Sequence, residues 1–280
     1  PDAMAVGNHE FDDGPEKLAE FMDKAYFPVI SGNTSVYTEP LLKKKLNGYV
    51  IVEKGGEKIG IVSVLAKDTA ETSSPGDNVK FIDEIKYLQS IVPEIESQGV
   101  NKVIALTHVG LEMDKRIAAA VPGIDVIVGG HSHTLLSNKA ERAEGPYPVM
   151  VENPDGVQVP IVQAFAYSKY VGELSVNFND EGVVTAAYGE PHLLDASVEP
   201  DSIFLAKVAS LGEPIEELKK KQVGSAEATI DGDRNSCRLG ECSMGNLVAD
   251  AMLARVKDQG IQIAIQNGGG VRASIDAGEV

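Results

Sequence analysis

The 280-residue sequence predicts an α/β protein, because short apolar runs typical of buried strands alternate with longer amphipathic patterns typical of helices. Residues 102–107 and 124–128 are continuous apolar runs of the kind that buried parallel strands show, and residues 113–121 lie between them as an expected crossover helix. Residues 83–98 place apolar side chains on one side and stop at Gly99, so we expect another helix there. This alternation predicts parallel pairing between the central strands.

Further short apolar runs predict the other strands of the first part of the chain. Two of them flank Gly55-Gly56, so we expect a hairpin, and the Glu181-Gly182 turn precedes a returning strand. We expect these strands at residues 26–31, 49–53, 58–65, 149–152, 161–166, 172–178 and 183–188.

The last third of the chain has a different pattern. We expect a long helix at residues 200–221, a strand at 226–230, a helix at 243–256 and a strand at 261–266. Ser243 is the expected N-cap of its helix, since its hydroxyl can accept a hydrogen bond from the first turn. We expect a domain boundary near residue 222, with the long helix as the connector.

The composition narrows the classes of function. Hydrophobic residues make up 43% of the chain, enough for one good core and a second, smaller one. The 42 acidic residues exceed the 25 basic ones and give a formal net charge of −17, which disfavours binding to nucleic acid. No apolar run is long enough to span a bilayer. Because the chain opens without Met inside a catalytic-looking loop, we expect it to begin and end within a longer protein.

The only two cysteines, Cys237 and Cys242, lie close together in the sequence. They could form a short-loop disulfide, half of a metal site or two reduced thiols. A zinc site would need two more soft ligands, and none lies nearby in the sequence. We favour the disulfide, which would indicate an oxidising compartment.

Four of the five histidines lie in three short loops that are rich in polar residues and glycine. The loops are Gly7-Asn8-His9-Glu10, Thr107-His108-Val109-Gly110 and Gly129-Gly130-His131-Ser132-His133. The last two follow predicted buried strands, where open α/β sheets place their sites. A lone histidine after a strand, such as His108, is more often structural than a ligand, and His192 fits no pattern. Imidazole nitrogens suit zinc and manganese, so the three loops together predict a metal site.

These three loops resemble the later metal motifs of the calcineurin-like metallophosphatases. Three longer stretches narrow the resemblance to the 5′-nucleotidase family, closest to the surface-anchored nucleotidases of animals and the periplasmic ones of bacteria. The stretches run from Asp2 to Gly14, from Ser236 to Asn246 and from Asn267 to Arg272. The likeness extends over essentially the whole chain.

The resemblance implies a particular architecture. We expect a four-layer α/β/β/α metallophosphatase domain at residues 1–199, without its N-terminal part. A connector helix would follow at residues 200–222, and residues 223–280 would begin an α/β substrate-binding domain. The family's Asp-x-His and Gly-Asp metal motifs would lie upstream of Pro1, and its aromatic base-stacking clamp beyond Val280.

The resemblance also implies a role for each residue that matches a family motif. Asn8, His108, His131 and His133 resemble metal ligands. Position 133 is Asn or Gln in the best-known nucleotidases but His in many other metallophosphatases. His9 resembles the catalytic histidine, and Asp12 the carboxylate that orients it. The residues that match substrate-binding positions are Arg234, Arg238, Asn267, Gly269 and Arg272.

The implied activity is hydrolysis of nucleoside 5′-monophosphates to nucleoside and phosphate. Two divalent ions, zinc, manganese or similar, would activate the water. We expect a nucleotide substrate and an extracytoplasmic location, whether periplasmic, secreted or on the cell surface. Any membrane anchor would lie outside this chain. We expect the chain by itself to be inactive.

Two other interpretations remain open at this stage. One is a related phosphoesterase that acts on cyclic nucleotides, nucleotide sugars or dinucleotides through the same metal site. The other is a non-catalytic nucleotide-binding or adhesion protein on a decayed metal site. The intact set of Asn8, His9, Asp12 and the loop histidines argues against the second.

Overall fold

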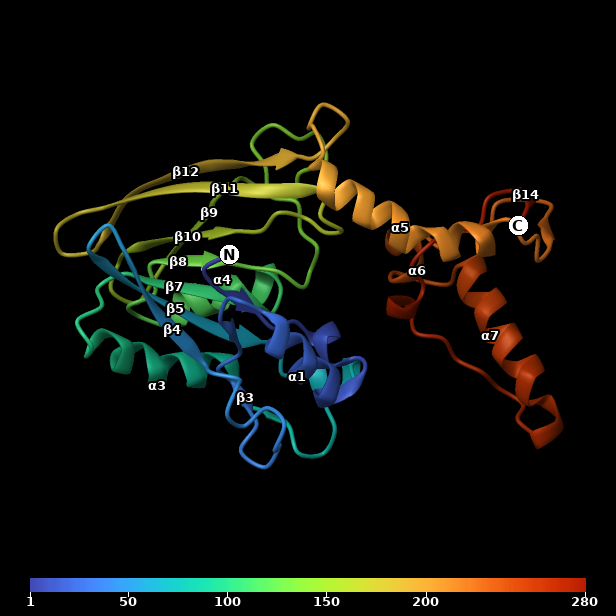
Figure 1. Cartoon of the computed structure of the whole chain (residues 1–280), viewed down its shortest axis with the longest axis horizontal. Coiled ribbons are helices and arrows are strands. Elements are labelled where there is room, and N and C mark those ends of the chain that lie inside the picture. The colour runs from blue at the N-terminus through green and yellow to red at the C-terminus, as the bar shows by residue number, and fades with distance from the viewer. The chain divides into compact units, whose positions relative to one another are not determined.

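The computed structural model describes residues 1–280, apart from the side chain of Glu279. The chain divides into two compact units, Pro1–Val198 and Glu199–Val280. Figure 1 shows the helices and strands of each unit in chain order. The two units are described separately below.

A six-stranded sheet forms the centre of the first unit. Its strands, in order across the sheet, are β4 (Tyr49–Lys54), β5 (Glu57–Leu65), β7 (Val103–His108), β8 (Val126–Val128), β10 (Gln158–Val162) and β9 (Val149–Glu152). The four central strands are parallel, and each edge strand pairs antiparallel with its neighbour. The predicted hairpin around Gly55-Gly56 and the parallel pairing of the two apolar runs are confirmed.

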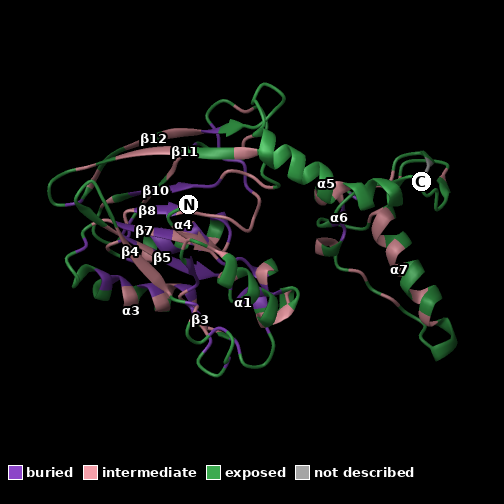
Figure 2. Ribbon diagram, viewed as in Figure 1, coloured by how far each residue is buried: buried purple, intermediate pink, exposed green. Residues whose placement is uncertain are grey.

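Two crossover helices cover one face of this sheet. They are α3 (Glu84–Glu96) and α4 (Leu111–Ala120). Right-handed crossovers that run in one direction across a sheet place both helices on the same face. Leu88 of α3 and Ile117 of α4 are fully buried in one core with Val62 and Val64 of β5. Figure 2 shows how the buried residues concentrate on the central strands.

A second, smaller core lies on the other side of β5. Side chains alternate along a strand, so Leu65 points away from the face that carries Val64 and packs in this second core. Phe11 and Leu18 fill it together with Val29. These residues come from η1 (Asn8–Phe11), α1 (Gly14–Lys24) and β2 (Val29–Ile30). The second core therefore holds the loop that carries Asn8.

The first unit also contains a long hairpin and several short elements. The hairpin joins β11 (Tyr170–Phe178) to β12 (Val184–Leu193), and His192, which fitted no motif, lies in β12. The predicted strand at 26–31 is only the two residues of β2, and the one at 161–166 begins earlier and ends at Val162. The short elements are β1 (Met4–Ala5), β3 (Thr34–Ser35), α2 (Thr69–Thr72) and β6 (Lys80–Phe81).

The second unit is mainly helical. Its elements are α5 (Ser202–Lys219), β13 (Ser225–Ala226), α6 (Arg234–Cys237), α7 (Ser243–Val256), η2 (Lys257–Gln259), η3 (Gly268–Gly270) and β14 (Gly278–Glu279). None of the helices in the described chain combines the length and hydrophobicity that a bilayer crossing requires.

Three predictions for the second unit were wrong in detail. The expected strand at 261–266 is irregular, because no strand among the described residues pairs with it and its isoleucines are exposed. The expected strand at 226–230 shortens to β13 and one isolated bridge at Ile230. The N-cap of α7 is Cys242, whose sulfur accepts from the Gly245 N–H at 3.3 Å. Ser243 Oγ instead accepts from the Asp231 N–H at 2.7 Å.

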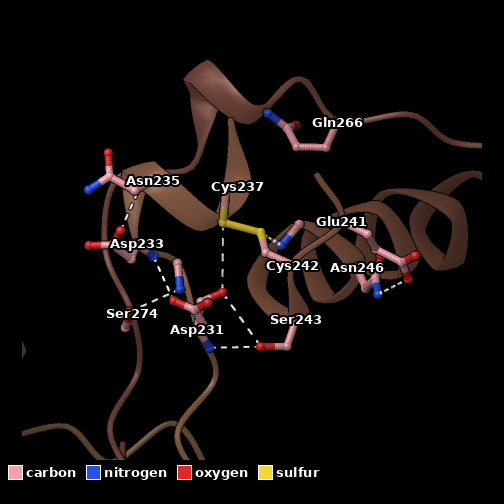
Figure 3. The surroundings of a disulfide bond; sticks show 12 residues. Asp231, Asp233, Asn235, Cys237, Glu241, Cys242, Ser243, Asn246, Gln266 and Ser274 are labelled. Carbon is pink, nitrogen blue, oxygen red and sulfur yellow. Dashed lines mark hydrogen bonds between the residues drawn. A yellow bond between two sulfur atoms is a disulfide. The ribbon is translucent and has the colours of Figure 1, made fainter. Parts of the chain in front are cut away.

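Cys237 and Cys242 form a disulfide, as predicted. The bond joins the last residue of α6 to the N-cap of α7 (Figure 3). Because a short covalent loop limits how far its two ends can move apart, the disulfide fixes the segment that carries Arg238.

The core between the six-stranded sheet and helices α3 and α4 allows a direct test of the packing. We expect Leu88→Ala to lower the free energy of unfolding by about 2–5 kcal/mol, because the side chain is fully buried and its removal leaves a cavity. Leu41→Ala is the matched control, since Leu41 is 45% exposed and its loss should cost less than about 1 kcal/mol. Equal losses in denaturant titrations of the two variants would contradict this description of the core.

Candidate functional site

The amide oxygen of Asn8 lies at the centre of the candidate site. Asn8 opens η1 directly after β1 and is 5% exposed. Its Oδ1 atom is 3.1 Å from Nε2 of His108 and 3.3 Å from Nδ1 of His131. The structure thus brings together residues from all three loops that the sequence singled out.

The sheet explains why the two histidines meet. His108 is the last residue of β7, and His131 follows β8, the parallel neighbour of β7. The carboxyl ends of parallel strands lie at one edge of a sheet, so both rings reach the same place. Their centroids are 5.1 Å apart.

Burial keeps His108 in the form that can bind a metal. Burial, with a smaller contribution from charge repulsion by the rings of His131, His9 and His133, lowers the pKa of His108 to about 4. The imidazole is therefore neutral near pH 7, with a lone pair available for a metal.

The loop after β8 has an unusual backbone. His131 has φ of 75° and His133 has φ of 59°, both in the left-handed region that residues with a Cβ seldom adopt. Strained residues of this kind persist only where the surrounding structure holds them, and they gather at functional sites. The ring of His133 packs edge-on against Tyr167, with 5.4 Å between the centroids.

His9 and Asp12 form a hydrogen-bonded pair beside Asn8. Side chains three residues apart in a 3₁₀-helix lie on the same side, and here Nδ1 of His9 is 2.7 Å from Oδ2 of Asp12. The hydroxyl of Ser73 donates to the other oxygen of Asp12 at 2.7 Å. The two side chains of the pair are half exposed, so the ring faces solvent and not the core.

The donor set fits a divalent ion. Two imidazole nitrogens and one amide oxygen converge, which is a mixed set that suits zinc, manganese and similar ions. Within the part of the chain that the structure describes, no three His, Cys, Asp or Glu side chains could hold a metal by themselves. The amide oxygen of Asn8 is therefore the atom that brings the two ring nitrogens together as a set of three donors.

Two buried polar residues beneath the histidine loops were missed by the sequence analysis. Asp114 of α4 is fully buried and accepts from the Thr107 hydroxyl at 2.6 Å, next to His108. Gln163 is 2% exposed and lies just after β10. A polar residue within the apolar run at 161–166 was the one signal in the sequence that could have revealed Gln163.

Three of the residues expected to bind substrate lie together in the second unit. A Cβ added to Gly269 would be 3.2 Å from Nδ2 of Asn267 and 3.7 Å from Nη2 of Arg238. Arg234 begins α6 and is half-buried, whereas Arg272 is exposed and follows Val271. A Cβ at Gly268 would collide with the backbone of α6, so the chain needs glycine there for the two segments to approach.

The fold and the histidine cluster place the chain in the class of metal-dependent phosphoesterases. Residues 1–135 match the calcineurin-like phosphoesterase family, and residues 222–280 match the C-terminal domain of 5′-nucleotidases. The chain belongs to the 5′-nucleotidase family, and its predicted mixed α/β fold is confirmed.

Curated relatives and solved structures agree with this placement. The mouse and human 5′-nucleotidases are each 40% identical to the chain over 98% of its length. The chain spans about half the length of the curated relatives it matches. A 5′-nucleotidase precursor from Thermus thermophilus superposes with a TM-score of 0.92 at 41% identity, over 99% of this chain and 56% of that one. The NAD nucleotidase of Haemophilus influenzae gives a TM-score of 0.74 at 29% identity, over 100% of this chain and 58% of that one.

The buried carboxyl of Asp114 generates a pH prediction. Burial raises the pKa of Asp114 from 3.8 to about 7, and among the described residues Oδ2 has no hydrogen-bond partner. The favourable contribution of the protonated group is therefore fully present below about pH 4 and is lost as the pH rises through about 7. The whole change amounts to roughly 4 kcal/mol.

We expect Asp114→Asn to remove this pH dependence. Between about pH 4 and pH 8, the free energy of unfolding of the wild type should fall relative to that of the variant. Denaturant titrations at both pH values measure the difference. Asp77→Asn, at an exposed carboxyl, is the matched control. Parallel pH profiles for the wild type and Asp114→Asn would show that Asp114 is ionised in the folded protein across this range.

Proposed function

We propose that the full-length protein that contains this chain hydrolyses nucleoside 5′-monophosphates to nucleoside and phosphate. The observation that carries the proposal is the convergence of His108 and His131 on Asn8, beside the His9–Asp12 pair. Membership of the 5′-nucleotidase family supports nucleotides as the substrate class.

Asn8, His108, His131 and His133 would hold two divalent ions, zinc, manganese or similar, together with ligands from outside this chain. Bound there, the ions would supply an ionised water and neutralise charge on the phosphate. Asn8 offers an amide oxygen, which suits harder ions, and the neutral rings offer nitrogen to softer ones.

His9 would act on the phosphoryl group and not on a metal. Asp12 accepts a hydrogen bond from Nδ1 of His9, so Nε2 of His9 is the atom that would donate to a phosphoryl oxygen. The hydrogen bond to Asp12 fixes the orientation of the ring, and Ser73 holds the carboxylate in place. A donor fixed in advance stabilises charge as it develops in the transition state.

The second unit would bind the substrate through Arg234, Arg238, Asn267, Gly269 and Arg272. A guanidinium presents a planar fork of donors to carboxylate, phosphate or the edge of a nucleoside. The lack of a Cβ at Gly269 allows a ligand to approach the backbone beside Arg238 and Asn267.

The disulfide supports an extracytoplasmic location for the protein. Disulfides persist in oxidising compartments, which include the bacterial periplasm and the cell exterior. The bond between Cys237 and Cys242 lies in the segment that carries Arg238, so reduction would loosen a proposed substrate-binding element.

The full-length protein tests the proposal. With zinc or manganese added, we expect phosphate release from AMP, and none after chelation. Cyclic AMP and NAD are the comparison substrates, because the bond that must be cleaved is a monoester in AMP, a diester in cyclic AMP and a phosphoanhydride in NAD. Turnover of NAD or cyclic AMP without hydrolysis of AMP would contradict the proposal that nucleoside 5′-monophosphates are the substrates.

We expect His9→Ala in the full-length protein to lower kcat by about 10²–10³, or roughly 2.7–4 kcal/mol, because it removes one donor to the transition state. Metal content should remain unchanged, whereas His108→Ala should lose metal. His192→Ala, at the hairpin strand β12, is the matched control. Metal analysis beside steady-state kinetics separates the roles, and loss of an ion on His9→Ala would make His9 a ligand.

Arg272→Ala should raise KM for AMP and leave metal content unchanged, since Arg272 lies in a different unit from the histidine cluster. Arg255→Ala is the matched control, because Arg255 is also exposed in the second unit. Unchanged kinetics with AMP and other nucleotides would remove Arg272 from the substrate-binding set.

A further inference from the structure

Gln163 is a buried polar residue that the proposed reaction does not use directly. It lies just after β10, the strand beside β8, and is 2% exposed. A buried amide is costly unless its donors and its acceptor have partners. The hydrogen-bond partners of the Gln163 side chain all come from one place, the loop that carries His131 and His133.

The amide of Gln163 contacts both ends of that loop. Its Oε1 atom accepts from the Thr134 N–H at 2.6 Å and from the Ser132 hydroxyl at 3.1 Å. Its Nε2 atom donates to the Gly130 carbonyl at 3.1 Å. One side chain therefore holds the backbone immediately before His131 and immediately after His133.

The segment that follows Gln163 holds the same loop from a second direction. The N–H of Phe165 donates to the Thr134 carbonyl at 2.9 Å, and the ring of Tyr167 packs against His133. Phe165 and Tyr167 also have left-handed φ values, of 64° and 59°. The left-handed segment that contains His131 and His133 therefore packs against the left-handed segment that contains Phe165 and Tyr167. Gln163, which is buried, contacts the first segment and directly precedes the second.

Gly129 lies against two buried polar side chains. A Cβ there would collide with the carboxyl of Asp114 and would lie 3.5 Å from Nε2 of Gln163. The missing side chain at Gly129 therefore makes room for the buried carboxyl of Asp114, and a Cβ there would be in ordinary contact with the amide of Gln163.

We infer that Gln163 is a positioning residue that orients His131 and His133 for metal binding. The inference rests on the proposed function, since it assumes that these histidines are ligands. Left-handed histidines need support from their surroundings, and three hydrogen bonds from one buried side chain provide it. Replacing a group that orients a metal ligand from behind typically lowers metal affinity by about 10–100-fold.

Two substitutions distinguish this role from simple packing. Gln163→Met keeps the length of the side chain and removes all three hydrogen bonds. Gln163→Glu keeps both acceptor contacts and, near pH 7, cannot donate to the Gly130 carbonyl. Gln158→Met is the matched control, because Gln158 is exposed at the start of β10, the strand that Gln163 follows.

The measurement is the Kd of the folded 280-residue chain for zinc, by competition with a chromophoric chelator. We expect Gln163→Met to weaken binding by about 10–100-fold and Gln163→Glu to weaken it by less, with Gln158→Met unchanged. Circular dichroism identifies any variant that does not fold. If Gln163→Met does not fold, Gln163→Glu decides the question. Wild-type affinity in the folded Gln163 variants would overturn the inference.

A second readout without metal separates this inference from the proposed metal site. In NMR spectra of the metal-free chain, Gln163→Met should shift or broaden the ring signals of His131 and His133 and leave those of His192 unchanged. If the wild type binds no zinc, the proposed metal site fails in this chain, and the ring signals still decide whether Gln163 orients the histidines. Unchanged His131 and His133 signals would overturn the positioning role.

Discussion

The meeting of two ring nitrogens at the Asn8 amide oxygen is the interaction on which the rest of the site depends. It requires three chain segments to meet at one edge of the sheet, with the two ring nitrogens 3.1 Å and 3.3 Å from the amide oxygen. The parallel order of β7 and β8 supplies two of them. The third comes from η1, which the smaller core anchors through the buried ring of Phe11. Each core thus positions one side of the site.

Buried polar groups around the site fall into two kinds. Asn33 is fully buried and fully used, since its amide donates to the carbonyls of Leu65 and Ile82 and accepts from the Leu65 N–H. This satisfied network fixes the end of β5. Asp114 is the opposite kind, with one carboxyl oxygen partnered and the other not. A buried oxygen without a hydrogen-bond partner lowers the stability of the fold, so its presence needs a reason other than stability.

Local patterns predicted the elements that place the histidines. The apolar run before His108 and the one before the Gly-Gly-His loop are buried parallel strands, as their composition indicated. Alternation alone was not enough at 261–266, because a strand also needs a neighbour to accept its backbone hydrogen bonds. Gln163 could not be assigned from sequence, because its partners lie about 30 residues away and depend on the register of β8 and β10. Contacts of that range follow from the assembled sheet.

The left-handed backbone at His131 and His133 restricts which amino acids can occupy these positions. Asparagine, aspartate and histidine tolerate this conformation better than other residues with a Cβ. All three are also metal ligands, and they differ in whether they offer oxygen or nitrogen. An exchange of histidine for asparagine at position 133 therefore keeps the fold of the loop while it changes the hardness of the donor. Among residues with a Cβ, the backbone therefore favours side chains that are also capable of binding a metal, so a substitution at position 133 can change the hardness of the available donor and leave the loop intact.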